Sequence, residues 1–385
     1  MECVEAPTDM SKARKRYVAL ACTIAFAFIH SLAGKAEDKA GVAATDSWDR
    51  QAAARYLDSR EAWWQWWDRA QKDHGTLCIS CHTQAPYGLA RPALRRELGE
   101  KEPVAQEQVM LASIRKRVSI WKDAEPFYPD AKYGDGKAAE SRNTEAVLNA
   151  MILASYDAQK GHLSETARAA FANAWELQAK TGPAAGAWVW QNFHYTPWES
   201  PESEYHGAAL MAMAVGNAPD RYRDDPKIPA NLAALRAYLR SHYAEQPMLN
   251  KLVALWASAW FPDLLTTADR DSLLSVIFTL QRPDGGWSLT GLGAWERMDS
   301  TPLEQRSDGY ATELIVLVLK EIGADSKADP HIARGIAWLK ANQDKATGAW
   351  PAWSLNKNRD PKSNVGQFMS DAATSYAVLA LELRR

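Results

Sequence analysis

Apolar residues recur along this chain in helical segments of two kinds. Segments of the first kind are apolar on nearly every side, are rich in Ala and Leu, and in five places follow a serine. These serines are Ser80, Ser141, Ser203, Ser307 and Ser370. Segments of the second kind carry charged residues on one face and apolar residues at helical spacing on the other, as in 167–179, 269–281 and 330–343. Because a helix that is apolar all round must be buried, and one with a charged face borders solvent, we expect buried helices to alternate with half-exposed ones.

The serines recur about every sixty residues, which indicates an internal repeat. Between Ser203 and Ser307 the gap is wider and leaves room for one more unit, which the apolar segment 250–260 supplies. The chain is therefore read as six units, each with an outer amphipathic helix and an inner buried one. Since each unit can bury its apolar face only against its neighbours, the sequence predicts an all-α fold, an (α/α)6 toroid of six helix-pair repeats.

The joints between outer and inner helices carry a signature of Gln, Gly and Trp. It is clear in 281–287, 343–350 and 178–188, and a degraded copy comprises Trp67, Gln71 and Gly75. We expect Gln to bond the backbone of the next turn, Gly to permit a tight bend, and Trp to cover the joint with apolar area. The pattern resembles the Gln-Trp repeat of the squalene cyclase and protein prenyltransferase superfamily, from Trp48 to Leu383. That resemblance implies an α/α barrel around a central cavity, which is usually apolar.

The known activities of that superfamily do not follow from the fold. The Asp-x-Asp-Asp motif of terpene cyclases is missing, and its nearest counterpart, 269–272, falls on an outer helix. Protein prenyltransferases bind zinc through an Asp-x-Cys pair, but the matching place here reads Asp308-Gly309-Tyr310 and has no cysteine. Terpene cyclase activity is therefore not expected, and the sequence leaves open whether the protein is an enzyme.

The N-terminus has the features of an export signal. Basic residues from Lys12 to Arg16 precede an apolar stretch from Tyr17 to Leu32, and small residues follow. We expect residues 1–36 to be a signal peptide and 37–385 a single toroid domain, exported and most simply periplasmic, with no membrane span after cleavage. An uncleaved N-terminal anchor is the alternative. The net charge of −2 gives no reason to expect a nucleic-acid partner.

Cleavage would leave only Cys78 and Cys81, within the motif Cys78-Ile79-Ser80-Cys81-His82. This spacing is typical of covalent haem attachment: the two thiols form thioethers to haem c and His82 binds the iron on the proximal side. The other ring nitrogen of His82 should bond a carbonyl. The sequence thus predicts an exported c-type haem protein that transfers electrons with a redox partner protein, or performs haem-based redox chemistry on an apolar ligand in the cavity. Two alternatives for the cysteine pair are less favoured. A redox disulfide would lack its usual βαβ setting, and a zinc site would need two more ligands.

The repeat register places the haem motif at the start of the first inner helix, where the inner helices surround one mouth of the cavity. Met369, at the start of the sixth inner helix, is the first candidate for the sixth iron ligand, ahead of His206 and Met298; a five-coordinate iron is the alternative. Aromatic residues in the loops are expected to wall this mouth and cover a porphyrin or an apolar ligand. They are Phe127, Tyr128, Tyr133, Trp190, Phe193, Tyr195, Trp198 and Trp295.

Four acidic residues, Glu145, Glu204, Asp308 and Asp371, fall near the same mouth and are weak catalytic candidates, since acids at helix starts usually act as caps. Two other functions stay open. The toroid could bind a lipid or isoprenoid without haem, with a local disulfide between the cysteines. It could also be a divergent enzyme, such as a cyclase or a carbohydrate-active hydrolase or lyase, that uses these carboxylates.

Overall fold

A computed structural model describes residues 47–324 and 329–382, so the predicted signal peptide at 1–36 lies outside the described residues. Six longer helix pairs dominate the described part of the chain. The first members of the pairs are α1 (Arg50–Trp66), α3 (Ala105–Ser119), α6 (Glu165–Leu177), α8 (Pro229–His242), α10 (Thr267–Thr279) and α12 (Pro330–Asn342). The second members are α2 (Gln84–Leu98), α5 (Lys137–Ala158), α7 (Ser203–Asn217), α9 (Met248–Ala257), α11 (Gly309–Glu321) and α13 (Phe368–Glu382).

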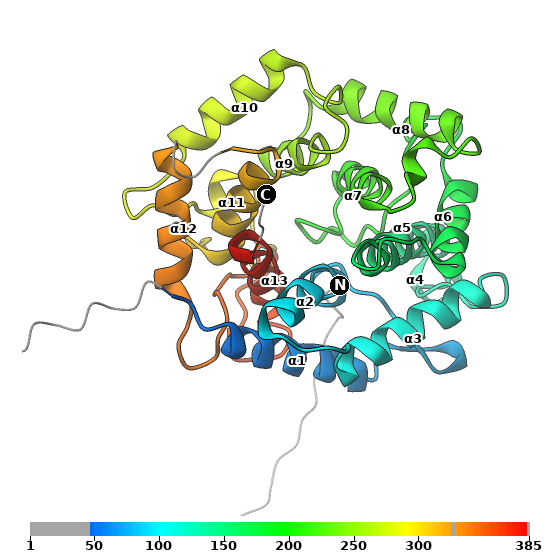
Figure 1. The fold of residues 1–385 in the computed structure, drawn as a ribbon, viewed down its shortest axis with the longest axis horizontal. Coiled ribbons are helices and arrows are strands. Elements are labelled where there is room, and N and C mark those ends of the chain that lie inside the picture. Colours follow the sequence, from blue (N-terminus) through cyan, green and yellow to red (C-terminus); the bar gives the residue numbers. More distant parts are fainter. Residues whose placement is uncertain (1–46, 325–328, 383–385) are drawn as a thin grey trace, which may run out of the picture. The chain divides into compact units, whose positions relative to one another are not determined.

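The two sets of helices form two concentric rings within this compact unit, with the second members inside (Figure 1). Each inner helix contacts the next, and α13 packs against α2, which closes the ring. The short helix α4 (Asp130–Tyr133) and the strands β1 (Gln71–Lys72) and β2 (Thr76–Leu77) lie in connections between outer and inner helices. The predicted (α/α)6 toroid is confirmed.

The burial of the two rings follows the two hydrophobic patterns. In the inner helix α11 every residue except Lys320 is buried. In the outer helix α6 the buried residues are Ala167, Ala170, Phe171, Ala174 and Trp175, which recur at three- and four-residue spacing along one face. The inner helices are therefore held by packing on all sides, and the outer ones shield them from solvent.

The Gln and Trp of each signature tie the joint together. Gln281 donates through Nε2 to the carbonyl oxygens of Gly285 and His331, each at 2.8 Å, and His331 belongs to the next outer helix, α12. Trp287 donates through Nε1 to the Ile277 carbonyl at 2.8 Å. Gly285 has φ of +91° and a Cβ there would lie 2.9 Å from a backbone oxygen, so the turn requires glycine. The joint thus connects two neighbouring outer helices as well as an outer and an inner one.

The same joint closes the ring between the last unit and the first. Gln343 donates to the Asp49 carbonyl at 2.9 Å and accepts from the Asp49 amide at 2.7 Å, just before α1. The first unit departs from the predicted copy of the signature, because its buried indole belongs to Trp64 inside α1. Trp64 donates to the Cys78 carbonyl at 2.9 Å, whereas Trp67 is half-buried and the side chain of Gln71 donates to the carbonyl of Gln65.

The connections differ in length at the two ends of the inner ring. Five of the six outer-to-inner connections are long, namely 67–83, 120–136, 178–202, 280–308 and 343–367, and they lie at the N-terminal ends of the inner helices; the sixth, 243–247 between α8 and α9, is short. The inner-to-outer connections 99–104 and 159–164 are short and lie at the other end. Among the described residues, no helix combines the length and apolar character that crossing a membrane requires.

Candidate functional site

The motif Cys78–His82 lies between β2 and α2, so the structure places it where the repeat register predicts, before the first inner helix. Cys78 is completely buried, and its amide donates to the Ala70 carbonyl at 2.8 Å. Neither Cys78 nor Cys81 takes part in a disulfide in the structure. Burial raises the pKa of Cys78 to about 12 and also raises the pKa of Cys81, so both groups are protonated thiols at neutral pH.

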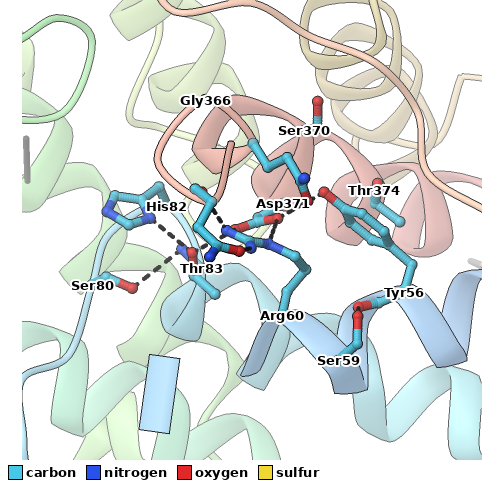
Figure 2. A network of polar contacts seen from close by, with 12 residues as sticks. Tyr56, Ser59, Arg60, Ser80, His82, Thr83, Gly366, Ser370, Asp371 and Thr374 are labelled. Carbon is cyan, nitrogen blue, oxygen red and sulfur yellow. Dashed lines mark hydrogen bonds and ion pairs between the residues drawn. The ribbon is translucent and has the colours of Figure 1, made fainter. Parts of the chain in front are cut away.

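His82 is held in one tautomer by a short relay of hydrogen bonds (Figure 2). The Thr83 hydroxyl donates to Oδ2 of Asp371 at 2.7 Å, so its oxygen accepts from Nδ1 of His82 at 2.8 Å. We expected a carbonyl to accept this proton, and the hydroxyl takes that place. The proton therefore resides on Nδ1, and Nε2 carries a lone pair that has no hydrogen-bond partner among the described residues.

Asp371 anchors the far end of this relay. Its carboxylate accepts from the Tyr56 hydroxyl at 2.8 Å and from Nε and Nη2 of Arg60 at 2.7 and 3.0 Å (Figure 2). Both Asp371 and Arg60 are buried. The carboxylate thereby joins α1, α13 and the Cys78–His82 segment, which fixes the first and last repeats at the point where the ring closes.

The imidazole of His82 is packed among aromatic rings. Phe368 is stacked on it with ring centroids 3.7 Å apart and planes at 23°, Trp64 meets it edge to face at 5.3 Å, and Trp198 lies tilted to it at 6.2 Å. Burial lowers the pKa of His82 well below its ordinary value, so the ring is neutral. A small pocket of about 20 Å³ adjoins it, with His82, Trp198, Phe368 and Met369 in its wall. That space suits about one water molecule.

The candidate sixth ligands have different positions. Met369 is buried and lines the same pocket as His82, as the closing of the ring predicts. His206 is buried on α7 and does not line this pocket. Met298 is 52% exposed in the connection before α11. Of the three, Met369 alone shares a pocket with His82.

Half of the eight aromatic residues expected at this mouth are buried in the loops that fill it, and Phe193, Tyr195 and Trp295 are half-buried. Phe127, Tyr128, Trp190 and Trp198 are buried, and Tyr133 is exposed. Trp198 donates through Nε1 to the Tyr310 hydroxyl at 3.1 Å, and Trp190 donates to the Trp198 carbonyl at 3.0 Å. The aromatic residues therefore close this end of the ring by packing against one another.

The four acidic candidates all have structural partners. Glu145 is paired with Arg117 and both side chains are completely buried. Glu204 accepts from the Tyr238 hydroxyl at 2.9 Å. Asp308 caps α11 by accepting from the Ala311 amide at 2.9 Å. With Asp371 in the relay above, none of the four lines the His82 pocket or the central cavity, so their proposed catalytic roles have no support in the geometry.

The large cavity lies at the opposite end of the inner ring. It has a volume of about 700 Å³ and is lined by the C-terminal halves of the inner helices. Its apolar wall includes Leu89, Met151, Met213, Trp256, Trp260, Leu317 and Leu379, and its charged members are Arg96, Glu97, Glu321 and Glu382. The expectation that the haem motif and the cavity mouth coincide is therefore wrong, because the long loops fill the N-terminal end and leave the C-terminal end open.

Among the described residues, no group of three or more His, Cys, Asp or Glu side chains is placed to hold a metal ion. No protein-family model matches the sequence, and no curated protein is significantly similar to it. Among solved structures, a glycosidase variant in complex with glucose is similar at 13% identity, over 89% of this chain and 99% of that one, with a TM-score of 0.49. This likeness assigns no function to the chain.

Proposed function

We propose that this chain is an exported c-type haem protein in which Cys78 and Cys81 form thioethers to haem c and His82 binds the iron. The observation that carries the proposal is the buried imidazole of His82, whose Nδ1–H is held by Thr83 and whose Nε2 has no partner in the described ranges 47–324 and 329–382. Histidines that bind metals usually donate their other ring nitrogen to a fixed acceptor, which orients the ring and raises the basicity of the ligand. The Thr83–Asp371 relay supplies that acceptor here.

Met369 is the proposed second axial ligand, since it lines the pocket next to His82. A bound haem supplies one-electron redox chemistry, and a His/Met ligand pair favours electron transfer over substrate binding at the iron. The position of the large cavity at the other end of the ring also favours electron transfer with a partner protein over haem chemistry on a ligand in that cavity.

The side chains of His82 and Met369 are suitable iron ligands, but the pocket between them is too small for a haem. A pocket of about 20 Å³ cannot admit a porphyrin, and Phe368 is stacked on the imidazole. Haem binding therefore requires Phe368 and the adjoining loops at 195–199 and 354–367 to move. The haem-bound protein should accordingly differ from the haem-free one in amide hydrogen exchange at these loops, and hardly in the outer helices.

The direct test is to express the full chain in a host that attaches c-type haem in an exported compartment. A reduced pyridine haemochrome spectrum, recorded after acid–acetone extraction, should show haem retained by covalent bonds. The double variant Cys78→Ala, Cys81→Ala should retain none, while the matched variant Ser80→Ala should keep it. Protein that carries no covalent haem in this host would overturn the proposal.

The second candidate function is the binding of a lipid or isoprenoid in the central cavity. It is favoured by the volume of about 700 Å³ and the apolar wall, which suit a ligand of drug size or larger. Trp256 and Trp260 lie in that wall, so an apolar ligand should change the tryptophan fluorescence of the protein. A titration with 1-dodecanol that shows no saturable change, and no heat of binding, would count against this function.

A further inference from the structure

Two inner helices carry buried polar groups that no described residue satisfies, at a level that we call the floor of the central cavity because it lies one helical turn below residues that line the cavity. Glu313 on α11 is completely buried, and neither of its carboxyl oxygens has a hydrogen-bond partner. Ser375 on the neighbouring helix α13 is also completely buried, and its hydroxyl has no partner either. Buried polar side chains are nearly always hydrogen-bonded, so two such groups on adjacent helices call for an explanation.

Helical spacing places both groups beneath the cavity. Glu313 precedes Leu317 by one turn, and Ser375 precedes Leu379 by one turn, and both leucines line the cavity. Residues four apart lie on the same face of a helix, about one 5.4 Å turn from each other. Glu313 and Ser375 therefore face the axis of the toroid one turn deeper than the cavity wall.

Ring contacts show that the faces of these helices meet at this depth. The ring of Tyr376, next to Ser375, lies 5.9 Å from that of Tyr310, one turn before Glu313. The same ring lies 5.9 Å from Trp256, which lines the cavity. Trp256 is 5% exposed and its Nε1 also has no partner. Unpartnered polar atoms thus come from three inner helices around one end of an apolar cavity.

We propose that this floor is a subsite for the hydroxyl group of an apolar alcohol, with Glu313 as its main partner and Ser375 beside it. The inference rests on the second candidate function, the binding of an apolar ligand in the cavity, and names the class of that ligand. The apolar body of the alcohol would lie against Leu317, Leu379 and Trp256, and its hydroxyl would point inward.

The charge state of Glu313 favours an alcohol over a charged head group. Burial raises the pKa of Glu313 well above its ordinary value, so the group is a neutral acid that can both donate and accept. A hydroxyl also donates and accepts, so the two groups complement each other. A carboxylate or ammonium head would have to lose its hydration beneath an apolar wall, which is costly without an ionised partner.

The test compares three probes that share one tail: 1-dodecanol, dodecanoate and dodecylammonium. Each is titrated into the full chain, and binding is followed by tryptophan fluorescence and calorimetry. We expect 1-dodecanol to bind most tightly, and Glu313→Leu to weaken it about 5- to 10-fold, the usual effect of one lost hydrogen bond. Glu313→Gln, which keeps a donor and an acceptor, should retain most of the affinity.

A matched control is available in Glu61→Gln, the same change in a buried glutamate on the outer helix α1, away from the cavity; it should leave 1-dodecanol binding unchanged. Circular dichroism of each variant establishes that the ring is intact. If none of the probes binds, the ligand-binding function itself fails, and the subsite with it. If all three bind equally and Glu313→Leu and Glu313→Gln change nothing, the cavity function stands and the subsite is wrong. Tighter binding of dodecylammonium than of 1-dodecanol, if Glu313→Gln abolishes it, would also overturn the subsite, because binding that depends on the Glu313 carboxylate requires an ionised Glu313, whereas binding to the lining residues Glu321 and Glu382 would survive the change.

Discussion

The two ends of the inner ring are built from the same six helices and have opposite characters. At the N-terminal end, long loops and buried aromatic rings fill the space, and a network of hydrogen bonds centred on Asp371 ties the first repeat to the last. At the C-terminal end, short connections leave an apolar cavity of about 700 Å³ open. The difference shows that the loops, and not the helices, decide where a toroid of this kind has room for a ligand.

The comparison also separates the two candidate activities. The Cys78–His82 motif belongs to the closed end, where the hydrogen bonds of Thr83 and Asp371 would hold the iron ligand His82 in one orientation. The central cavity belongs to the open end. Tyr310 and Tyr376, packed between the inner helices, lie between the two. Substitutions at one end should therefore affect stability and function differently from the same substitutions at the other.

The largest difference in lost stability is expected between substitutions of two acidic residues of α13. Asp371→Ala at the closed end leaves the buried Arg60 without its carboxylate, and it should lower the free energy of unfolding by about 3–5 kcal/mol. Glu382→Ala at the open end breaks an ion pair with Arg50, whose side chain is 40% exposed, and should cost about 1 kcal/mol or less. Urea denaturation of the two variants and the parent measures the contrast, and equal losses would mean that the two ends are equally well packed.

The buried carboxyl group of Glu61, at the closed end, should make the stability of the protein depend on pH. This buried residue of α1 accepts from Gln84 and Gln65, yet burial raises its pKa from an ordinary 4.5 to about 7. Between these two values the folded protein binds more protons than the unfolded chain, so this group makes the parent less stable as pH rises. Glu61→Gln removes the effect.

We therefore expect Glu61→Gln to gain stability relative to the parent by up to about 3 kcal/mol between pH 5 and pH 8, the size that such a pKa shift implies. Chemical denaturation of both proteins at a series of pH values measures the difference. The variant Glu102→Gln, at an exposed residue in the connection 99–104, serves as the control and should show little change in stability. A constant difference between parent and Glu61→Gln over this range would contradict the assignment.

Much of the fold was predictable from sequence because the repeat has strong physical markers. Gln281 and Gln343 bond across the joints as their positions at helix ends predict, and the serine register locates the inner helices to within about a turn. The place of Cys78–His82 before the first inner helix follows from the same register. The nearness of Met369 to His82 follows from the closing of the ring.

The chemistry of the site was less predictable, because inner helices that are apolar on every side do not indicate which face lines the axis. For that reason the sequence did not single out Glu313 or Trp256. It also suggested Glu145 and Glu204 as catalytic candidates. Their partners in the structure, the buried Arg117 and the Tyr238 hydroxyl, come from other helices, so the sequence could not show these contacts. The end at which the cavity opens depends on how the loops fold over the ring, which no repeat pattern specifies.

A small effect on stability, and the sharpest effect on function, is expected for Met369→Leu. The exchange nearly conserves volume at a buried position, so it should change the free energy of unfolding by less than about 1.5 kcal/mol. If Met369 is an axial ligand, however, the haem protein should lose the weak near-infrared band of methionine-ligated ferric haem, and its reduction potential should fall, since a Met/His ligand pair raises it.

Met213→Leu, a similar exchange in the wall of the open cavity, is the matched control. It should leave both the spectrum and the potential unchanged, while it alters the affinity for 1-dodecanol slightly. Spectra and redox titrations of the two variants therefore separate the closed end from the open one. If Met369→Leu keeps the near-infrared band and the reduction potential of the parent, the sixth iron ligand is another group, which comes from a different part of the ring. If both variants alter the reduction potential, the two ends are coupled through the inner helices.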